Sequence, residues 1–105
     1  MRIQHLDKHL NFLDEKFGRS VVFSTDTAAQ FMYTFKPDQA MTEHTHPLSA
    51  EYIVVLEGEA QISVGTETVI AEVNAVVLVL AGEVHSIHNY GREPLVIMSF
   101  MSPKP

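Results

Sequence analysis

The chain of 105 residues has no cysteine, few basic residues and no long apolar run. The absence of cysteine excludes a disulfide framework and thiolate chemistry. The seven Lys and Arg residues are scattered, and a formal net charge of −6 at pH 7 argues against nucleic acid or an anionic membrane as a partner. The longest apolar run, residues 75–81, is far shorter than the roughly 20 residues that cross a bilayer. The N-terminal residues lack the apolar core of a signal peptide, so we expect a cytoplasmic location.

The length of the chain suits one small domain, residues 1–105, with no room for a second. Short segments rich in β-branched and aromatic residues, punctuated by glycine and proline, predict an all-β sandwich or barrel. The expected strands are residues 20–24, 30–36, 40–46, 51–57, 59–64, 67–73, 75–80, 84–89 and 94–101. Before them, Leu6, Leu10, Leu13 and Phe17 recur at steps of four, three and four, which predicts a short amphipathic helix over about residues 5–17.

Three histidines and one glutamate have spacings that suit a single metal ion. His44 and His46 are two residues apart in an extended segment, so their side chains share one face of a strand. Glu51 opens the next expected strand, and His85 follows the apolar strand 75–80 and a turn at Ala81-Gly82. Three imidazoles and one carboxylate suit one divalent transition metal ion, Fe, Mn, Ni or Zn, with coordination positions left open.

Other interpretations of these four residues stay open. Two histidines at this spacing are common on exposed strands, and a single glutamate in a strand is usually solvated. Buried histidines and a glutamate also satisfy one another by hydrogen bonding without any metal.

The order H-x-H, four residues, E, six residues, G is met by His44, His46, Glu51 and Gly58, and a later G-x-x-H-x-x-x-N is met by Gly82, His85 and Asn89. This pair of motifs resembles those of the cupin superfamily, in particular its small single-domain members. Leu80 stands where the second motif usually has proline, and Asp38 and Asn74 stand where the two motifs usually open with glycine. Both Asp and Asn tolerate left-handed turn geometry, so we interpret these departures as turn variation.

The resemblance covers about residues 30–101 and implies a cupin-type, RmlC-like double-stranded β-helix, or jelly-roll barrel. It also implies that His44, His46, Glu51 and His85 are the metal ligands.

Strand parity predicts which side chains line the pocket around the metal. If the ligands face inward, so do Thr42, Ile53, Val55, Ile87 and Asn89. The sequence leaves open which faces of strands 30–36 and 94–101 look inward; we expect Tyr33, Met98 and Phe100 as further pocket candidates. No Lys or Arg falls at a position that strand parity predicts to face inward, and Arg19 is expected to precede the first strand. This argues against phosphorylated sugars and favours substrates that bind the metal through oxygen atoms.

Three classes of function remain. The first is a metalloenzyme of dioxygenase, isomerase or lyase type, and thus in one variant an oxidoreductase, acting on a small oxygen-rich metabolite with Glu51 as ligand and catalytic proton acceptor. The second is a non-catalytic cupin that binds or senses a small molecule without turnover, and the third is a structural or assembly role. Strand 75–80 is apolar on both faces, which one barrel interior does not require, so a homodimer is expected in every class.

Overall fold

The computed structural model describes all residues from Met1 to Pro105. Nine strands form where the sequence predicts them, with ends that differ by at most two residues because hydrogen bonding, not residue preference, sets where a strand stops. The strands are β1 (Gly18–Ser24), β2 (Ala29–Phe35), β3 (Ala40–His44), β4 (Ala50–Glu57), β5 (Ala60–Val64), β6 (Glu67–Ala71), β7 (Val76–Val79), β8 (His85–His88) and β9 (Leu95–Ser102).

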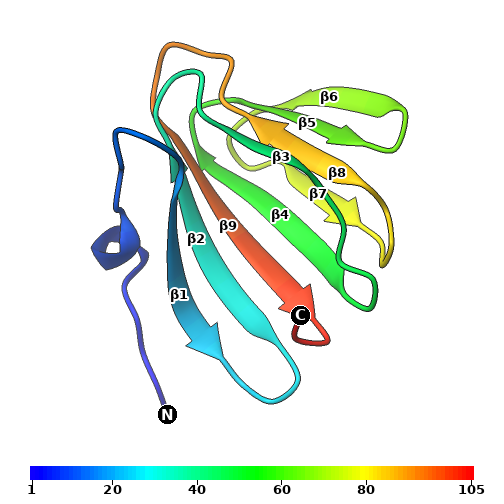
Figure 1. The fold of residues 1–105 in the computed structure, drawn as a ribbon. Coiled ribbons are helices and arrows are strands. Elements are labelled where there is room, and N and C mark those ends of the chain that lie inside the picture. Colours follow the sequence, from blue (N-terminus) through cyan, green and yellow to red (C-terminus); the bar gives the residue numbers. More distant parts are fainter.

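The strands make two antiparallel sheets that face each other (Figure 1). The larger sheet has the order β1-β2-β9-β4-β7, and the smaller has the order β3-β8-β5-β6. Because the chain crosses repeatedly between the two sheets from β3 onward, residues far apart in the sequence become neighbours. The all-β, jelly-roll prediction is confirmed.

The core lies between the sheets and is built by the inward residues of each strand. Registered neighbours Tyr33, Ile97 and Val55 form one row across β2, β9 and β4, and all three are buried. Burying a side chain of this size contributes roughly 1.5–3 kcal/mol. The aromatic face of β2 therefore looks inward, with Phe31 and Phe35 beside Tyr33 in the same cluster.

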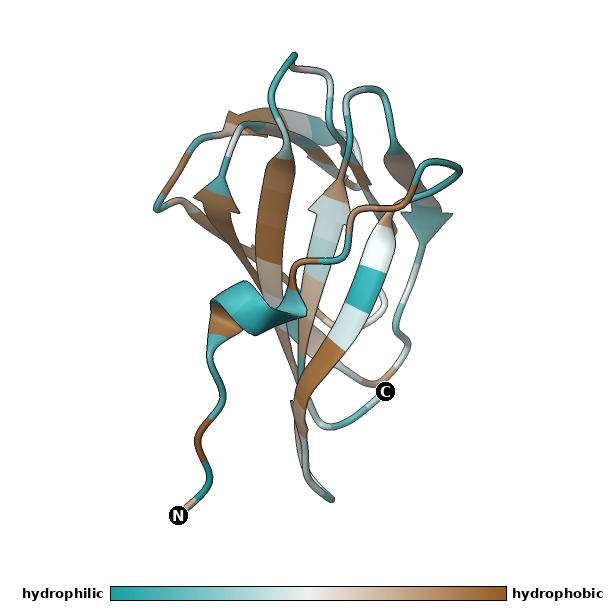
Figure 2. Ribbon diagram, turned by 90° about the vertical axis from the view of Figure 1, so that its left-hand side faces the viewer, coloured by the Kyte–Doolittle hydropathy of each residue, from teal (hydrophilic) through white to brown (hydrophobic).

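The N-terminal helix predicted over residues 5–17 is wrong in extent. Only one 3-10 turn forms, Leu6–His9 (η1), and it has no side-chain cap at its start. The apolar stripe is used differently: Leu6 packs on an outer cluster around Met32, whereas Phe17 packs on the inner core and stacks against Phe35 at 5.4 Å. Burial on two different sides of the sheet requires an irregular segment. Figure 2 shows the turn lying in front of a sheet coloured largely hydrophobic. The structure contains no helix with the length and hydropathy needed to cross a bilayer.

The two positions that replace family glycines have the backbone conformation that glycine favours. Asp38 has φ 70° and Asn74 has φ 77°, and they are the two non-glycine residues with positive φ. Both are residue types that visit this left-handed region more readily than most. The interpretation of these departures as turn variation is thereby supported.

Candidate metal centre

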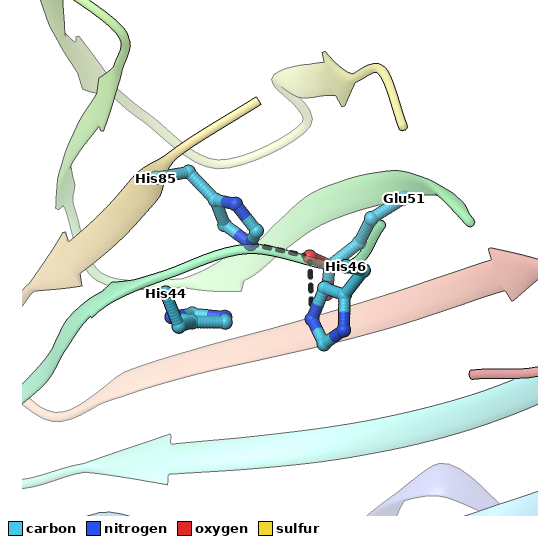
Figure 3. A group of neighbouring side chains, drawn as sticks. All are labelled: His44, His46, Glu51 and His85. Atoms are coloured by element: carbon cyan, nitrogen blue, oxygen red, sulfur yellow. Dashed lines mark hydrogen bonds and ion pairs between the residues drawn. The ribbon is translucent and has the colours of Figure 1, made fainter. Parts of the chain in front are cut away.

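The two motifs are brought together by the pairing of β3 with β8. His44, the last residue of β3, and His85, the first of β8, are register partners. Beyond β3, the backbone N–H of Gly82 donates to the carbonyl oxygen of His46 at 2.9 Å, which fastens the turn before His85 to the loop after β3. Glu51 enters from β4 of the other sheet, so the cluster spans both sheets (Figure 3).

The four side chains converge on one point between the sheets. One ligand atom from each of His44, His46, Glu51 and His85 lies within 4.8 Å of all the others. The Nε2 atom of His85 is 2.9 Å from Oε1 of Glu51, and Nε2 of His46 is 3.9 Å from the same oxygen. Ligand atoms held about 2.1 Å from one ion stand about 3 Å apart when adjacent and about 4.2 Å apart when opposed. The cluster therefore fits a metal after side-chain shifts of less than about 1 Å.

Two of the imidazoles are already oriented for coordination. Nδ1 of His44 lies 2.8 Å from the carbonyl oxygen of Thr42, and Nδ1 of His85 lies 3.1 Å from that of Glu83. A carbonyl oxygen only accepts, so each ring carries its proton on Nδ1 in these bonds. The Nε2 atoms are left as the ligand atoms, which is the arrangement that metal-binding histidines commonly show.

Glu51 is an ionised carboxylate in a buried place. Only 2% of it is exposed, and Ser99 donates its hydroxyl to Oε2 while His85 contacts Oε1. Burial by itself raises the pKa of Glu51, but the hydrogen bonds from His85 and Ser99 and the nearby imidazoles outweigh burial, so the pKa of Glu51 is lowered. A carboxylate that is ionised at neutral pH is what a metal ligand requires.

The pKa values of His85 and His46 move in opposite directions. Burial lowers the pKa of His85, but its hydrogen bond to Glu51 and the charge of that carboxylate exceed this effect, so the pKa of His85 is raised. The pKa of His46 is lowered, chiefly by burial and further by the neighbouring His44 and His85, against an opposing contribution from Glu51.

Several expected pocket residues lie in the barrel interior next to the cluster. Ile53, Val55 and Ile87 are almost fully buried in the core. Tyr33 also faces inward, and burial, followed by the charge of Glu51, raises the pKa of its hydroxyl. The cluster opens beside His46 into a hollow of about 290 Å³, bounded by the loop after β3 and by residues 104 and 105.

Three pocket predictions based on parity are wrong. A β-bulge between Met41 and His44 adds a residue to β3, so Met41 packs against the core and Thr42 is exposed. On β9 the faces are the reverse of those expected from the sequence: Phe100 is 40% exposed, and Met98 packs on the outer cluster. A period of two fixes which residues share a face but cannot tell which face is inside.

The side chain of Asn89 is buried, but its hydrogen bonds are to backbone groups and not to the pocket. Its side-chain NH₂ donates to the carbonyl oxygens of Phe35 and Glu93, and its side-chain oxygen accepts from the N–H of Gly91. Both of its donor hydrogens are committed to these bonds, so Asn89 has no donor left to orient a ligand.

The residue that sequence reasoning missed is Ser99. It is 1% exposed, faces inward on β9 and contacts the carboxylate of Glu51. The only sequence signal for it is the alternation Ile97, Ser99, Met101, a polar residue among apolar ones on one face, and that signal is readable only once the inner face is known.

Comparison with known proteins finds a relative of similar sequence. A protein of Streptomyces glaucescens, described as tetracenomycin polyketide synthase protein TcmJ, is 34% identical over 67 residues. The alignment covers 64% of this chain and 45% of that protein, so the chain spans less than half of the relative's length.

Solved structures agree with the fold over nearly the whole chain. The crystal structure of TT1209 from Thermus thermophilus has a TM-score of 0.95 at 27% identity and covers 100% of both chains. A Klebsiella pneumoniae protein with a double-stranded β-helix domain has a TM-score of 0.91 at 26% identity, covering 98% of this chain and 90% of that one.

An RmlC-like cupin from Desulfovibrio desulfuricans is 24% identical and has a TM-score of 0.86, covering 98% of this chain and 97% of that one. At this identity the likeness shows the fold alone. The family model described as a cupin domain matches residues 31–101, more than half of the sequence, and both motifs lie within that span. The chain therefore belongs to the cupin domain family.

Proposed function

We propose that this protein is a metal-dependent cupin that acts on a small oxygen-rich metabolite bound at one divalent transition metal ion, Fe, Mn, Ni or Zn. The observation that carries the proposal is the convergence of three imidazoles and one carboxylate, from both sheets, within 4.8 Å of one another. Dioxygenase, isomerase and lyase chemistry all fit such a centre.

The ligands in this proposal are His44, His46, Glu51 and His85. A bound divalent ion supplies Lewis acidity and positions where substrate oxygen atoms attach. Glu51 is the catalytic group of this chain: its lowered pKa leaves it ionised at neutral pH, the form that accepts a proton, and the Ser99 hydroxyl donates a hydrogen bond that holds it in place. The apolar walls around the cluster exclude water, which strengthens interactions between charges inside the site.

The relative from Streptomyces supports the substrate class. Its description places it with polyketide synthesis, and polyketides are rich in carbonyl and hydroxyl oxygen atoms. We extend to this chain only the chemical class, a compact molecule with two adjacent oxygen atoms that chelate a metal.

Elemental analysis of untagged protein purified without chelators tests the metal. We expect about one equivalent of Fe, Mn, Ni or Zn per chain, because four ligands of mixed imidazole and carboxylate type hold such ions tightly. Protein that contains no metal and takes up none on titration would overturn the proposal.

The second candidate function is small-molecule binding or sensing without turnover. The observation that favours it is the hollow beside His46, which is open to ligand even if no reaction follows. The metal-loaded protein separates the two candidates. Saturable consumption of a chelating substrate, or of dioxygen in its presence, identifies an enzyme, whereas tight binding with no product identifies a sensor.

We also propose a homodimer formed through the outer face of the larger sheet. Tyr52, Leu78 and Phe100 are registered neighbours on β4, β7 and β9, and each is at least 40% exposed. The N-terminal segment covers the β1 and β2 side of this face but leaves these residues uncovered. A second copy of the chain is the occupant we propose, and sedimentation equilibrium measures it.

The His85 and Glu51 pair makes stability of the metal-free protein depend on pH. A raised pKa of His85 adds stability that is fully present below about 6.5 and is lost as the pH rises through the raised value. A lowered pKa of Glu51 adds stability that is present above about 4.5 and is lost as the pH falls through the lowered value. We expect the free energy of unfolding of the wild type to exceed that of Glu51→Gln most between about pH 4.5 and 6.5.

Denaturant titration of chelator-treated protein at several pH values measures this difference. The lowered pKa of His46 makes stability rise with pH in both proteins. This effect is larger in Glu51→Gln, which lacks the opposing charge of Glu51, so it adds to the same difference at low pH. A difference that does not vary with pH would show that the pair is not ionised as described.

A further inference from the structure

Arg19 lies on the inner face of the larger sheet, at its open edge, which the sequence did not predict. It was expected to precede the first strand, but β1 begins at Gly18 and Arg19 is the register partner of Tyr33 on β2. Registered partners in an antiparallel pair point to the same side, and Tyr33 points inward. The guanidinium carbon of Arg19 lies 4.3 Å from the centre of the Phe31 ring. The pocket face of the barrel therefore carries a cation after all.

The charge of Arg19 is not matched by any acid. The ion pairs of the structure join Lys36 with Asp14 and three histidines with Glu51 or Asp38, and none involves Arg19 or Lys104. A guanidinium stacked on an aromatic ring presents its five N–H groups at its edge. One side of the Arg19 guanidinium interacts with the Tyr33 hydroxyl, but Arg19 borders a hollow rather than a carboxylate, so it has N–H groups left to donate to a ligand. Arg19 is exposed at this hollow, so a ligand there can reach its guanidinium.

The hollow at Arg19 adjoins the opening of the metal centre. It has a volume of about 250 Å³, and its walls include Val21, Phe31 and Lys104. Lys104 also borders the hollow that opens onto His46. One lysine thus stands between the two hollows, with Arg19 on one side and a metal ligand on the other.

A short chain of contacts links Arg19 to the ligand set. Arg19 covers Phe31, Phe31 is the register partner of Ser99 across β2 and β9, and Ser99 donates to Glu51. Tyr33 is also near both ends, since the charges of Glu51 and Arg19 both act on the pKa of its hydroxyl, after the larger effect of burial. Phe31 and Ser99 are buried and fill the direct path between Arg19 and the ligand set, so the route open to a ligand runs through the two hollows that share Lys104.

We propose that Arg19, assisted by Lys104, binds a carboxylate at the far end of the substrate whose oxygen atoms attach at the centre formed by His44, His46, Glu51 and His85. This inference rests on the proposed function and narrows its substrate to an acid. The guanidinium fork presents two parallel N–H groups that match the two oxygens of one carboxylate. Stacking on Phe31 fixes the plane of the fork, so the carboxylate is oriented as well as attracted. The substrate is accordingly a chelating diol or hydroxy-keto compound that carries one carboxylate.

Two probes that differ only in charge test this site. The acid 3-(3,4-dihydroxyphenyl)propionate and its amide have the same chelating diol and the same flexible two-carbon linker to the terminal group. Their affinities for zinc-loaded protein are measured by calorimetry, and the zinc content of each sample by elemental analysis. We expect the wild type to bind the acid about tenfold more tightly than the amide, because a hydrogen bond to a charged group is worth about that factor.

The variant Arg19→Gln is expected to bind both probes equally, with zinc content and amide affinity unchanged. The matched control is Arg92→Gln, which removes the same charge from the exposed loop between β8 and β9, at the opposite end of the barrel from the loop that carries His46 (Figure 1). This control is expected to keep the tenfold preference. If zinc and both probes bind but Arg19→Gln keeps the preference for the acid, the carboxylate site is overturned and the metal centre stands. If the wild type holds no zinc, both proposals are overturned.

Discussion

The His44→Ala protein is expected to lose its metal while staying folded. Removing one of four ligands is expected to weaken metal binding by more than about 100-fold, since even an outer partner of a ligand is worth 10- to 100-fold. The cost in stability should be small, about 1 kcal/mol, because His44 is only half-buried and its one hydrogen bond is to the carbonyl oxygen of Thr42. Elemental analysis reports the metal, and denaturant unfolding reports the fold.

His85→Ala should lose the metal as well, but at a much greater cost in stability. His85 is 1% exposed and contacts Glu51, so its removal leaves a buried carboxylate without its cationic partner, a change worth about 3–5 kcal/mol. The matched control is His88→Ala on the same strand, since His88 lies outside the cluster and contacts Gln61. Full metal occupancy at unchanged affinity in His44→Ala, or loss of metal in His88→Ala, would contradict the assignment of ligands.

Gly58→Ala is expected to destabilise the barrel by about 2–5 kcal/mol, the sum of left-handed backbone strain and overpacking. Gly58 follows β4 with φ +82°, a conformation that side chains rarely adopt. An added Cβ would collide with the carbonyl oxygen of Pro94 and lie 3.1 Å from the Cα of Leu95. Both of these are backbone atoms, so relief requires the start of β9 to move. Thermal or denaturant unfolding measures the loss.

Gly65→Ala separates the two causes of that loss. Gly65 also has a positive φ, +59°, but a Cβ there meets no atom within 4 Å. Its replacement should cost only the backbone strain, roughly 1–2 kcal/mol. Equal losses for Gly58→Ala and Gly65→Ala would mean that the close approach to Pro94 has no energetic weight.

The candidate site could be predicted from the sequence because its residues lie in short, separate segments of fixed spacing. His44 and His46 share a segment, Glu51 opens the strand that follows, and His85 begins another strand after a turn. The pairing of the two motifs specifies which strands must meet, and the β3–β8 register then brings His44 beside His85. The same holds for the left-handed turns at Asp38 and Asn74, whose residue types reveal the backbone conformation they tolerate.

The residues that line the site could not be predicted from the sequence in the same way. Alternation along β9 groups Ser99 with Ile97 and groups Met98 with Phe100, but both sets contain apolar residues, so hydropathy does not say which set faces the core. On β3 a single bulge exchanges Met41 for Thr42 at the core. A bulge depends on how two distant strands hydrogen-bond, and nothing local in β3 announces it.

The sequence by itself determined the all-β class, the approximate positions of nine strands and the four converging side chains, because each depends on residue types at short spacings. Only the tertiary structure decided that Ser99 supports Glu51, that Tyr33 faces the cluster, and that Arg19 lies on the inner side of its sheet. These placements depend on which sheet each strand joins and on which side the second sheet covers it. Long-range pairing supplies that information, since the side-chain pattern of an isolated strand is the same whichever face is buried.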